Sequence, residues 1–176
     1  MISKKAEQFA RKKHAGQIRN FSNEPYFNHV KRVSENIRKY KKSHKSEELV
    51  AAAFLHDTLE NTNTTYEEIE EKFGRLVASL VEEMTNDKKE ISHSNKKRYL
   101  ASKLSDTKKM SSWGLCLKLS DRLDNISDLN ITSPEFKKKY IEETEYIIDT
   151  LEKKRELTET QKHLIKDIKK ILLDLK

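Results

Sequence analysis

Residues that break helices are scarce along this chain. Among its 176 residues there are only 3 glycines and 2 prolines, while Lys, Glu, Leu and Ile are abundant. Glycine and proline disfavour the interior of a helix more than any other residues, whereas Lys, Glu and Leu favour it. The sequence therefore predicts an all-α fold. Its length fits a single domain over residues 1–176, with room for a substantial core.

Apolar residues recur at helical spacing in segments that short polar stretches separate. These patterns, with capping signals at Ser46, Thr65 and Ser133, predict helices over about 3–18, 25–42, 46–61, 65–74, 75–85, 95–105, 111–128, 134–155 and 158–175. The stretch "GLCLKL" alternates as a strand would, but the spacing of the leucines that follow favours a helix. We expect residues 86–94 to form a loop, and the last helix to close the core rather than form an interface.

The segment "LVAAAFLHDTLEN" places His56 and Asp57 directly after a run of apolar residues. A helix that is apolar nearly all round is typical of the centre of a fold. Burying an imidazole beside a carboxylate is costly unless something compensates it. A divalent cation would compensate the charge and use the neutral imidazole as a ligand. The simpler alternative is that the two side chains hydrogen-bond to each other or to nearby backbone.

Two further segments supply candidate ligands for such a cation. His29 follows a Pro-Tyr pair in "EPYFNHVKRV", and Asp121 lies in the apolar segment "LKLSDRLDNISDL", with Asn125 one helical turn later. Two histidines and two aspartates form a hard, mixed nitrogen and oxygen site that suits manganese, iron or another first-row ion. Glu60 lies four residues after His56 and therefore shares its helix face.

Four blocks of the sequence, "FARKKHAGQIR", "EPYFNHVKRV", "AAAFLHDTLENTNTT" and "LKLSDRLDNISDLN", together resemble a known family. Their order and spacing are similar to those of the HD superfamily of metal-dependent phosphohydrolases. More narrowly, they resemble the hydrolase domain of Rel/SpoT enzymes and the single-domain small alarmone hydrolases. The resemblance implies a helical HD-domain fold. It also implies a 3′-diphosphatase that converts (p)ppGpp to GDP or GTP and pyrophosphate.

The resemblance also implies roles for individual residues. The metal ligands would be His29, His56, Asp57 and Asp121, with manganese as the usual ion. Glu60 and Asn61 occupy the positions of two acids that orient or activate the attacking water. The substrate contacts would be Arg19 on the base, Asn125 on the sugar, and Lys88 and Lys97 toward the phosphates.

Asn61 departs from the family pattern, which has a second acid at this position. An amide can hold a water molecule by hydrogen bonds, but it cannot take its proton at neutral pH. Three interpretations therefore stay open. Glu60 and the metal suffice for alarmone hydrolysis; the substrate is another nucleotide, such as NADPH or an adenosine analogue of the alarmone; or the chain is a weakened HD protein that binds a nucleotide without turnover.

The charge and composition limit the expected partners. Lys and Arg number 36 against 29 Asp and Glu, for a net charge of +7, and a basic surface suits anionic ligands such as nucleotides. The sequence shows no nucleic-acid-binding motif and no apolar span or signal peptide, so we expect neither nucleic acid nor membrane as a partner, and a cytoplasmic location. Cys116 is the single cysteine, which excludes an internal disulfide. The oligomeric state is not indicated.

Overall fold

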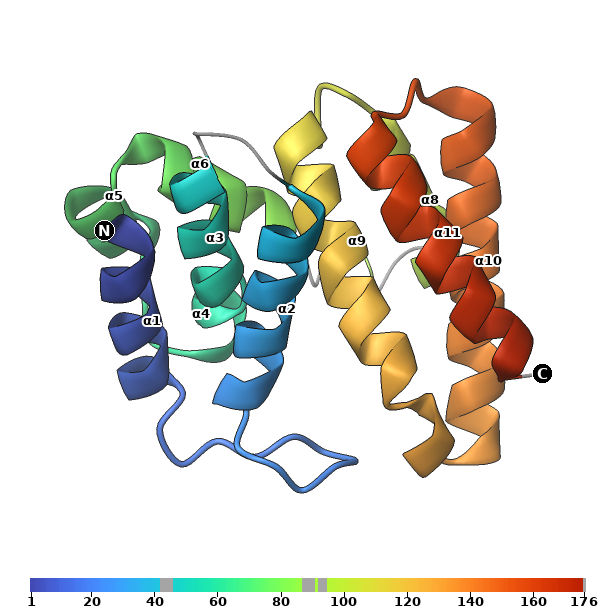
Figure 1. Ribbon diagram of the computed structural model, residues 1–176, viewed down its shortest axis with the longest axis horizontal. Coiled ribbons are helices and arrows are strands. Elements are labelled where there is room, and N and C mark those ends of the chain that lie inside the picture. Colours follow the sequence, from blue (N-terminus) through green and yellow to red (C-terminus); the bar gives the residue numbers. More distant parts are fainter. Residues whose placement is uncertain (42–45, 87–90, 92–94, 176) are drawn as a thin grey trace. The chain divides into compact units, whose positions relative to one another are not determined.

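The protein is described by a computed structural model that covers residues 1–41, 46–86, 91 and 95–175 (Figure 1). Within these ranges the regular structure is helical, and pairing between extended segments is limited to an isolated bridge between Ile18 and Pro25. The predicted all-α fold is therefore confirmed. No helix of this part of the chain is both long and apolar enough to cross a membrane. The chain forms two compact units, Met1–Thr85 and Asn86–Lys176.

The helices of the first unit follow one another with short connections. They are α1 (Ile2–Lys13), α2 (Phe27–Tyr40), α3 (Ser46–Leu55), α4 (Thr58–Asn61), α5 (Tyr66–Phe73) and α6 (Arg75–Met84). Helix α3 packs against α1, α2 and α6, and every residue of Leu49–Leu55 is buried (Figure 1). The prediction of a central, buried helix in this segment is confirmed.

Helix α1 is shorter than the sequence predicts. It ends at Lys13, not near residue 18, because the chain turns through Gly16, whose φ of 79° suits glycine. The backbone N–H of Tyr26 then donates to the carbonyl of Gln17 at 2.9 Å, and the N–H of Arg19 donates to that of Glu24 at 3.0 Å. These bonds hold residues 14–26 as a closed loop, which we call the α1–α2 loop.

The second unit contains longer helices. Its described elements are α8 (Lys96–Ser105), α9 (Ser112–Ser127), the 3-10 helix η1 (Leu129–Ile131), α10 (Pro134–Lys154) and α11 (Glu159–Asp174). The stretch "GLCLKL" belongs to α9 and is helical, as expected. Helix α11 packs against α9 and buries Leu164, Ile165 and Ile168, so it closes the core of this unit. Most of the loop expected at 86–94, including Lys88, lies outside the described residues.

A buried ion pair joins α9 to α10 inside the second unit. The guanidinium of Arg122 donates to the carboxylate of Glu143 at 2.8 Å and to the hydroxyl of Thr144 at 2.8 Å. It also lies 4.8 Å from the centre of the Tyr140 ring. Burying the charge of Arg122 costs desolvation free energy, and its hydrogen-bond partners compensate this cost. Removing one of these partners should therefore destabilise the fold.

Replacing Glu143 with leucine should therefore lower the free energy of unfolding by about 3 kcal/mol, since it leaves Arg122 buried without its carboxylate. The control is Asp149→Ala, which breaks the exposed pair of Asp149 with Lys153 and should cost less than about 1 kcal/mol. Urea unfolding followed by circular dichroism measures both. Equal effects of the two changes would contradict this account of the pair.

Candidate metal centre

His56 and Asp57 lie in a break between two helices. The sequence predicts one continuous helix over 46–61, and this prediction is wrong: α3 ends at Leu55 and α4 begins at Thr58. Two side chains bond to carbonyls of the last turn of α3. The hydroxyl of Thr58 donates to Leu55 at 2.7 Å, and Nδ1 of His56 lies 2.8 Å from the oxygen of Ala53. Such local bonds satisfy the carbonyls that a helix end leaves open.

The bond to Ala53 fixes the tautomer of His56. A carbonyl oxygen only accepts, so Nδ1 carries the proton and Nε2 keeps its lone pair. This arrangement, in which one ring nitrogen donates to backbone and the other faces the site, is typical of histidines that bind metals. The break in the helix thus orients Nε2 of His56 as a candidate nitrogen ligand.

His29 brings a second imidazole to the same place. It is the third residue of α2, directly after the α1–α2 loop, and both histidines are at most 2% exposed. Nε2 of His29 lies 3.5 Å from Oδ2 of Asp57, and Nε2 of His56 lies 3.3 Å from the same oxygen. One candidate ligand atom from each of the three residues lies within 4.8 Å of the other two.

Burial alone would raise the pKa of the Asp57 carboxyl, but His56 and His29 beside it hold that pKa well below its ordinary value. Asp57 is therefore a carboxylate at neutral pH. Two imidazole nitrogens and one carboxylate oxygen, converging in a largely buried position, are a donor set that suits a divalent first-row ion. The residues fit the metal that the sequence predicts, although this set does not identify manganese.

Four residues around Asp57 form a network of which the sequence analysis singled out only Asn61. The hydroxyl of Tyr26 donates to Oδ2 of Asp57 at 2.6 Å, and the amide of Asn61 donates to the Tyr26 oxygen at 3.1 Å. The amide of Gln17 donates to the backbone oxygen of Asn61 at 2.8 Å, and Nδ1 of His14 donates to Oε1 of Gln17 at 2.7 Å.

One signal for His14 was present in the sequence. Ala6, Ala10 and His14 follow at intervals of four, so the imidazole continues a stripe of small residues that the structure buries completely. Its ring stacks on Tyr26, with ring centres 5.0 Å apart. Tyr26 and Gln17 carried no such signal, because only the closure of the α1–α2 loop brings them to α4.

The other predicted site residues of the first unit lie on neighbouring segments. Glu60 is half-buried on α4, one turn after His56, and Arg19 lies in the α1–α2 loop. Their contacts with water and base remain predictions.

Asp121, Asn125 and Lys97 belong to the second unit. The carboxylate of Asp121 accepts from Asn125 at 2.7 Å and from Lys118 at 3.1 Å. Lys97 lies 5.5 Å from the centre of the Tyr146 ring. The structure thus joins two of the predicted residues, Asp121 and Asn125, by a hydrogen bond. Ligation of the metal by Asp121 remains a prediction.

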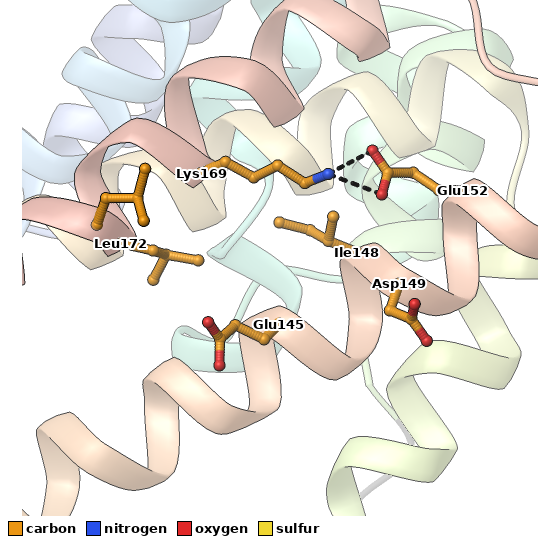
Figure 2. Close-up of a pocket in the computed structure, with 7 residues that line it drawn as sticks. Glu145, Ile148, Asp149, Glu152, Lys169 and Leu172 are labelled. Carbon is orange, nitrogen blue, oxygen red and sulfur yellow. Dashed lines mark hydrogen bonds and ion pairs between the residues drawn. The ribbon is translucent and has the colours of Figure 1, made fainter. Parts of the chain in front are cut away.

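A cavity of about 350 Å³ between α10 and α11 has a different character (Figure 2). Its apolar floor is bordered by Glu145, Asp149 and Glu152, and Lys169 binds both carboxylate oxygens of Glu152 at 2.7 and 2.8 Å. Carboxylates repel the negative charge of a phosphorylated ligand, and the charge of Lys169 is already paired with Glu152, so this cavity does not favour such a ligand. This cavity contains none of the predicted site residues.

A family model described as HD domain matches residues 6–157 of this chain. The guanosine-3′,5′-bis(diphosphate) 3′-pyrophosphohydrolase of Aquifex aeolicus (strain VF5) is 41% identical over 140 residues, which make up 80% of this chain and 19% of that protein. The chain therefore spans about a fifth of that relative.

Smaller relatives match over most of their length. The guanosine-3′,5′-bis(diphosphate) 3′-pyrophosphohydrolase MESH1 of Drosophila melanogaster is 37% identical over 128 residues, covering 72% of this chain and 69% of that one. A solved structure reported under the statement that a metazoan ortholog of SpoT hydrolyzes ppGpp and plays a role in starvation responses matches with a TM-score of 0.77. The two sequences are 28% identical, and the match covers 96% of this chain and 94% of the chain in that structure.

Removing a ligand should abolish the metal site. In His56→Ala or Asp57→Ala, we expect the affinity for Mn²⁺ to fall by more than about 100-fold. This exceeds the loss that is typical when a residue hydrogen-bonded to a metal ligand is removed. Elemental analysis after dialysis against Mn²⁺, with isothermal titration, measures this. The control is His163→Ala, which removes an exposed histidine of α11. Wild-type affinity in Asp57→Ala would contradict the ligand assignment.

Acid should destabilise the protein partly through His14. Burial lowers the pKa of this imidazole below its ordinary value of 6.5. Between the lowered value and 6.5 the unfolded chain binds more protons, so stability falls as the pH drops through this window. Melting temperatures at pH 7.5 and 5.5 should therefore differ less in His14→Asn than in wild type. His163→Asn should behave as wild type, and an unchanged difference in His14→Asn would refute the contribution.

Proposed function

Because the chain belongs to the HD domain family and carries a buried His-His-Asp cluster, we propose that it is a metal-dependent phosphohydrolase that acts on guanosine alarmones. The reaction removes the 3′-pyrophosphate of (p)ppGpp and yields GDP or GTP and pyrophosphate. The observation that carries the proposal is the convergence of His29, His56 and Asp57 within 4.8 Å. Support for the substrate comes from relatives named as 3′-pyrophosphohydrolases of guanosine-3′,5′-bis(diphosphate).

We propose Mn²⁺ as the ion, held by His29, His56 and Asp57, with Asp121 of the second unit as the fourth ligand. When bound, a divalent cation acts as a Lewis acid and lowers the pKa of a water ligand toward neutrality. The protein supplies the fixed tautomer of His56 and the ionised state of Asp57. Both require bonds that the first unit already contains.

Glu60 is the residue we assign to the attacking water. It lies on the short helix α4, three residues after Asp57, and the residue is half-buried. A carboxylate near a nucleophilic water orients it and takes a proton from it. The amide of Asn61 cannot take a proton at neutral pH, so the proton transfer in this proposal depends on Glu60 alone.

The substrate contacts follow the family pattern. A planar guanidinium such as that of Arg19 suits the face of a purine base. Asn125 would bind the sugar, and its hydrogen bond to Asp121 would fix the sugar relative to that ligand. Lys97, together with Lys88 outside the described residues, would add positive charge near the phosphates.

We propose a single hydrolase domain over residues 1–176. The family match over residues 6–157 extends across the division between the two compact units, which supports this proposal. The absence of nucleic-acid and membrane partners and the cytoplasmic location remain predictions from the sequence.

Incubation of the Mn²⁺-loaded protein with a nucleotide panel tests the activity. We expect pyrophosphate and GDP from ppGpp, and no product after the metal is removed with a chelator. NADPH and the adenosine analogue of the alarmone are the competing substrates, and chromatography separates the products. Preferential turnover of either would replace the alarmone proposal, whereas binding of ppGpp without product would indicate a non-catalytic HD protein.

Glu60→Gln should lower kcat by about 10²–10³-fold, because general base catalysis contributes on this scale. Its Mn²⁺ affinity should change little, since Glu60 is not among the ligands. Glu67→Gln, an exposed change on α5, is the matched control and should leave kcat unchanged. Wild-type turnover in Glu60→Gln would exclude the assigned role.

A further inference from the structure

The α1–α2 loop delivers one hydroxyl to the metal centre. Tyr26 directly precedes α2, three residues before His29, and its oxygen is 2.6 Å from Oδ2 of Asp57. The hydroxyl of Tyr26 is the donor of this bond, so its single proton points at the carboxylate of Asp57. Hydrogen bonds from a hydroxyl to a carboxylate at this distance are among the strong ones.

Asn61 also forms a hydrogen bond with the Tyr26 hydroxyl. Since the proton of Tyr26 is already donated to Asp57, its oxygen can only accept from Asn61, whose Nδ2 lies 3.1 Å away. A directed chain results, from the Asn61 amide to the Tyr26 hydroxyl to the Asp57 carboxylate. An acid at position 61 would be a second acceptor, which would compete with Asp57 for one proton.

The rest of the loop keeps both ends of this chain in place. The amide of Gln17 donates to the backbone oxygen of Asn61, and the imidazole of His14 donates to Gln17. The same imidazole stacks on the ring of Tyr26 with ring centres 5.0 Å apart, and Tyr26 also meets the His29 ring edge-on at 5.8 Å. The phenol is therefore fixed by two rings and two hydrogen bonds.

We propose that Tyr26 is a positioning residue for the metal centre, and that Asn61 is the donor which holds it. The hydroxyl does not bind the metal itself; it fixes the orientation of the Asp57 carboxylate, which does, as hydrogen-bond partners of metal ligands commonly do. Asn61 then serves as a hydrogen-bond donor where the family pattern has an acid. This inference rests on the metal site in the proposed function, but not on the identity of the nucleotide.

Tyr26→Phe tests the inference, because it removes one oxygen and keeps the ring contacts. We expect the Mn²⁺ affinity to fall by about 10–100-fold, measured by electron paramagnetic resonance of the free ion during titration. The absorption bands of bound Co²⁺ should also change, since they report the ligand geometry. The melting temperature of the metal-free protein should stay within about 3 °C of wild type. The matched control is Tyr66→Phe, whose hydroxyl meets Ser79 at 3.4 Å in the same unit.

A second variant measures the coupling between Asn61 and Tyr26. Asn61→Leu removes the donor at similar size and should lower Mn²⁺ affinity by about 3–10-fold when Tyr26 is present, but less than about 2-fold in the Tyr26→Phe background. Affinity in Tyr26→Phe within twofold of wild type, or equal effects of Asn61→Leu in both backgrounds, would overturn the inference. If the wild type binds Mn²⁺ but hydrolyses none of the panel, only the proposed reaction fails. If it binds no Mn²⁺, both fail.

Discussion

The end of α3 at Leu55 is the constraint on which the candidate site depends. Had the helix continued, the backbone would have satisfied its own carbonyls and His56 would have been one more side chain on a buried surface. Because the helix stops, the imidazole of His56 bonds to Ala53, and its second nitrogen faces Asp57. A buried imidazole and a partly buried carboxylate, which would otherwise be a cost in folding, thereby form an oriented pair of candidate ligands.

Core packing and hydrogen bonds hold the segments around this break in place. Helix α3 buries seven consecutive residues, Leu49–Leu55, so its end cannot shift without disturbing the core of the first unit. The α1–α2 loop, closed by the backbone bond from Tyr26 to Gln17, adds the Tyr26 hydroxyl, and helix α2, which follows the loop, adds His29. The site therefore combines a well-packed helix end with a loop that is fixed at several points.

Much of this could be predicted from the sequence. The scarcity of glycine and proline indicated the helices, and the apolar run before His56 indicated a central helix with a costly pair at its end. The break at Leu55 could not be predicted, because side-chain bonds to backbone decide it against helical periodicity. The early end of α1 could not be predicted either, because it depends on the turn through Gly16 and on the backbone bonds that close the following loop. Tyr26 and Gln17 escaped notice because their role follows from tertiary closure of a loop, which no local pattern encodes.

The central claim is that His29, His56 and Asp57 together hold one cation. Diffraction from crystals grown with Mn²⁺, with anomalous data collected on both sides of the manganese absorption edge, tests it most directly. The account predicts one strong anomalous peak, within bonding distance of Nε2 of His29, Nε2 of His56 and a carboxylate oxygen of Asp57. Electron density that shows these groups bonded only to one another, with no anomalous signal between them at saturating Mn²⁺, would contradict it.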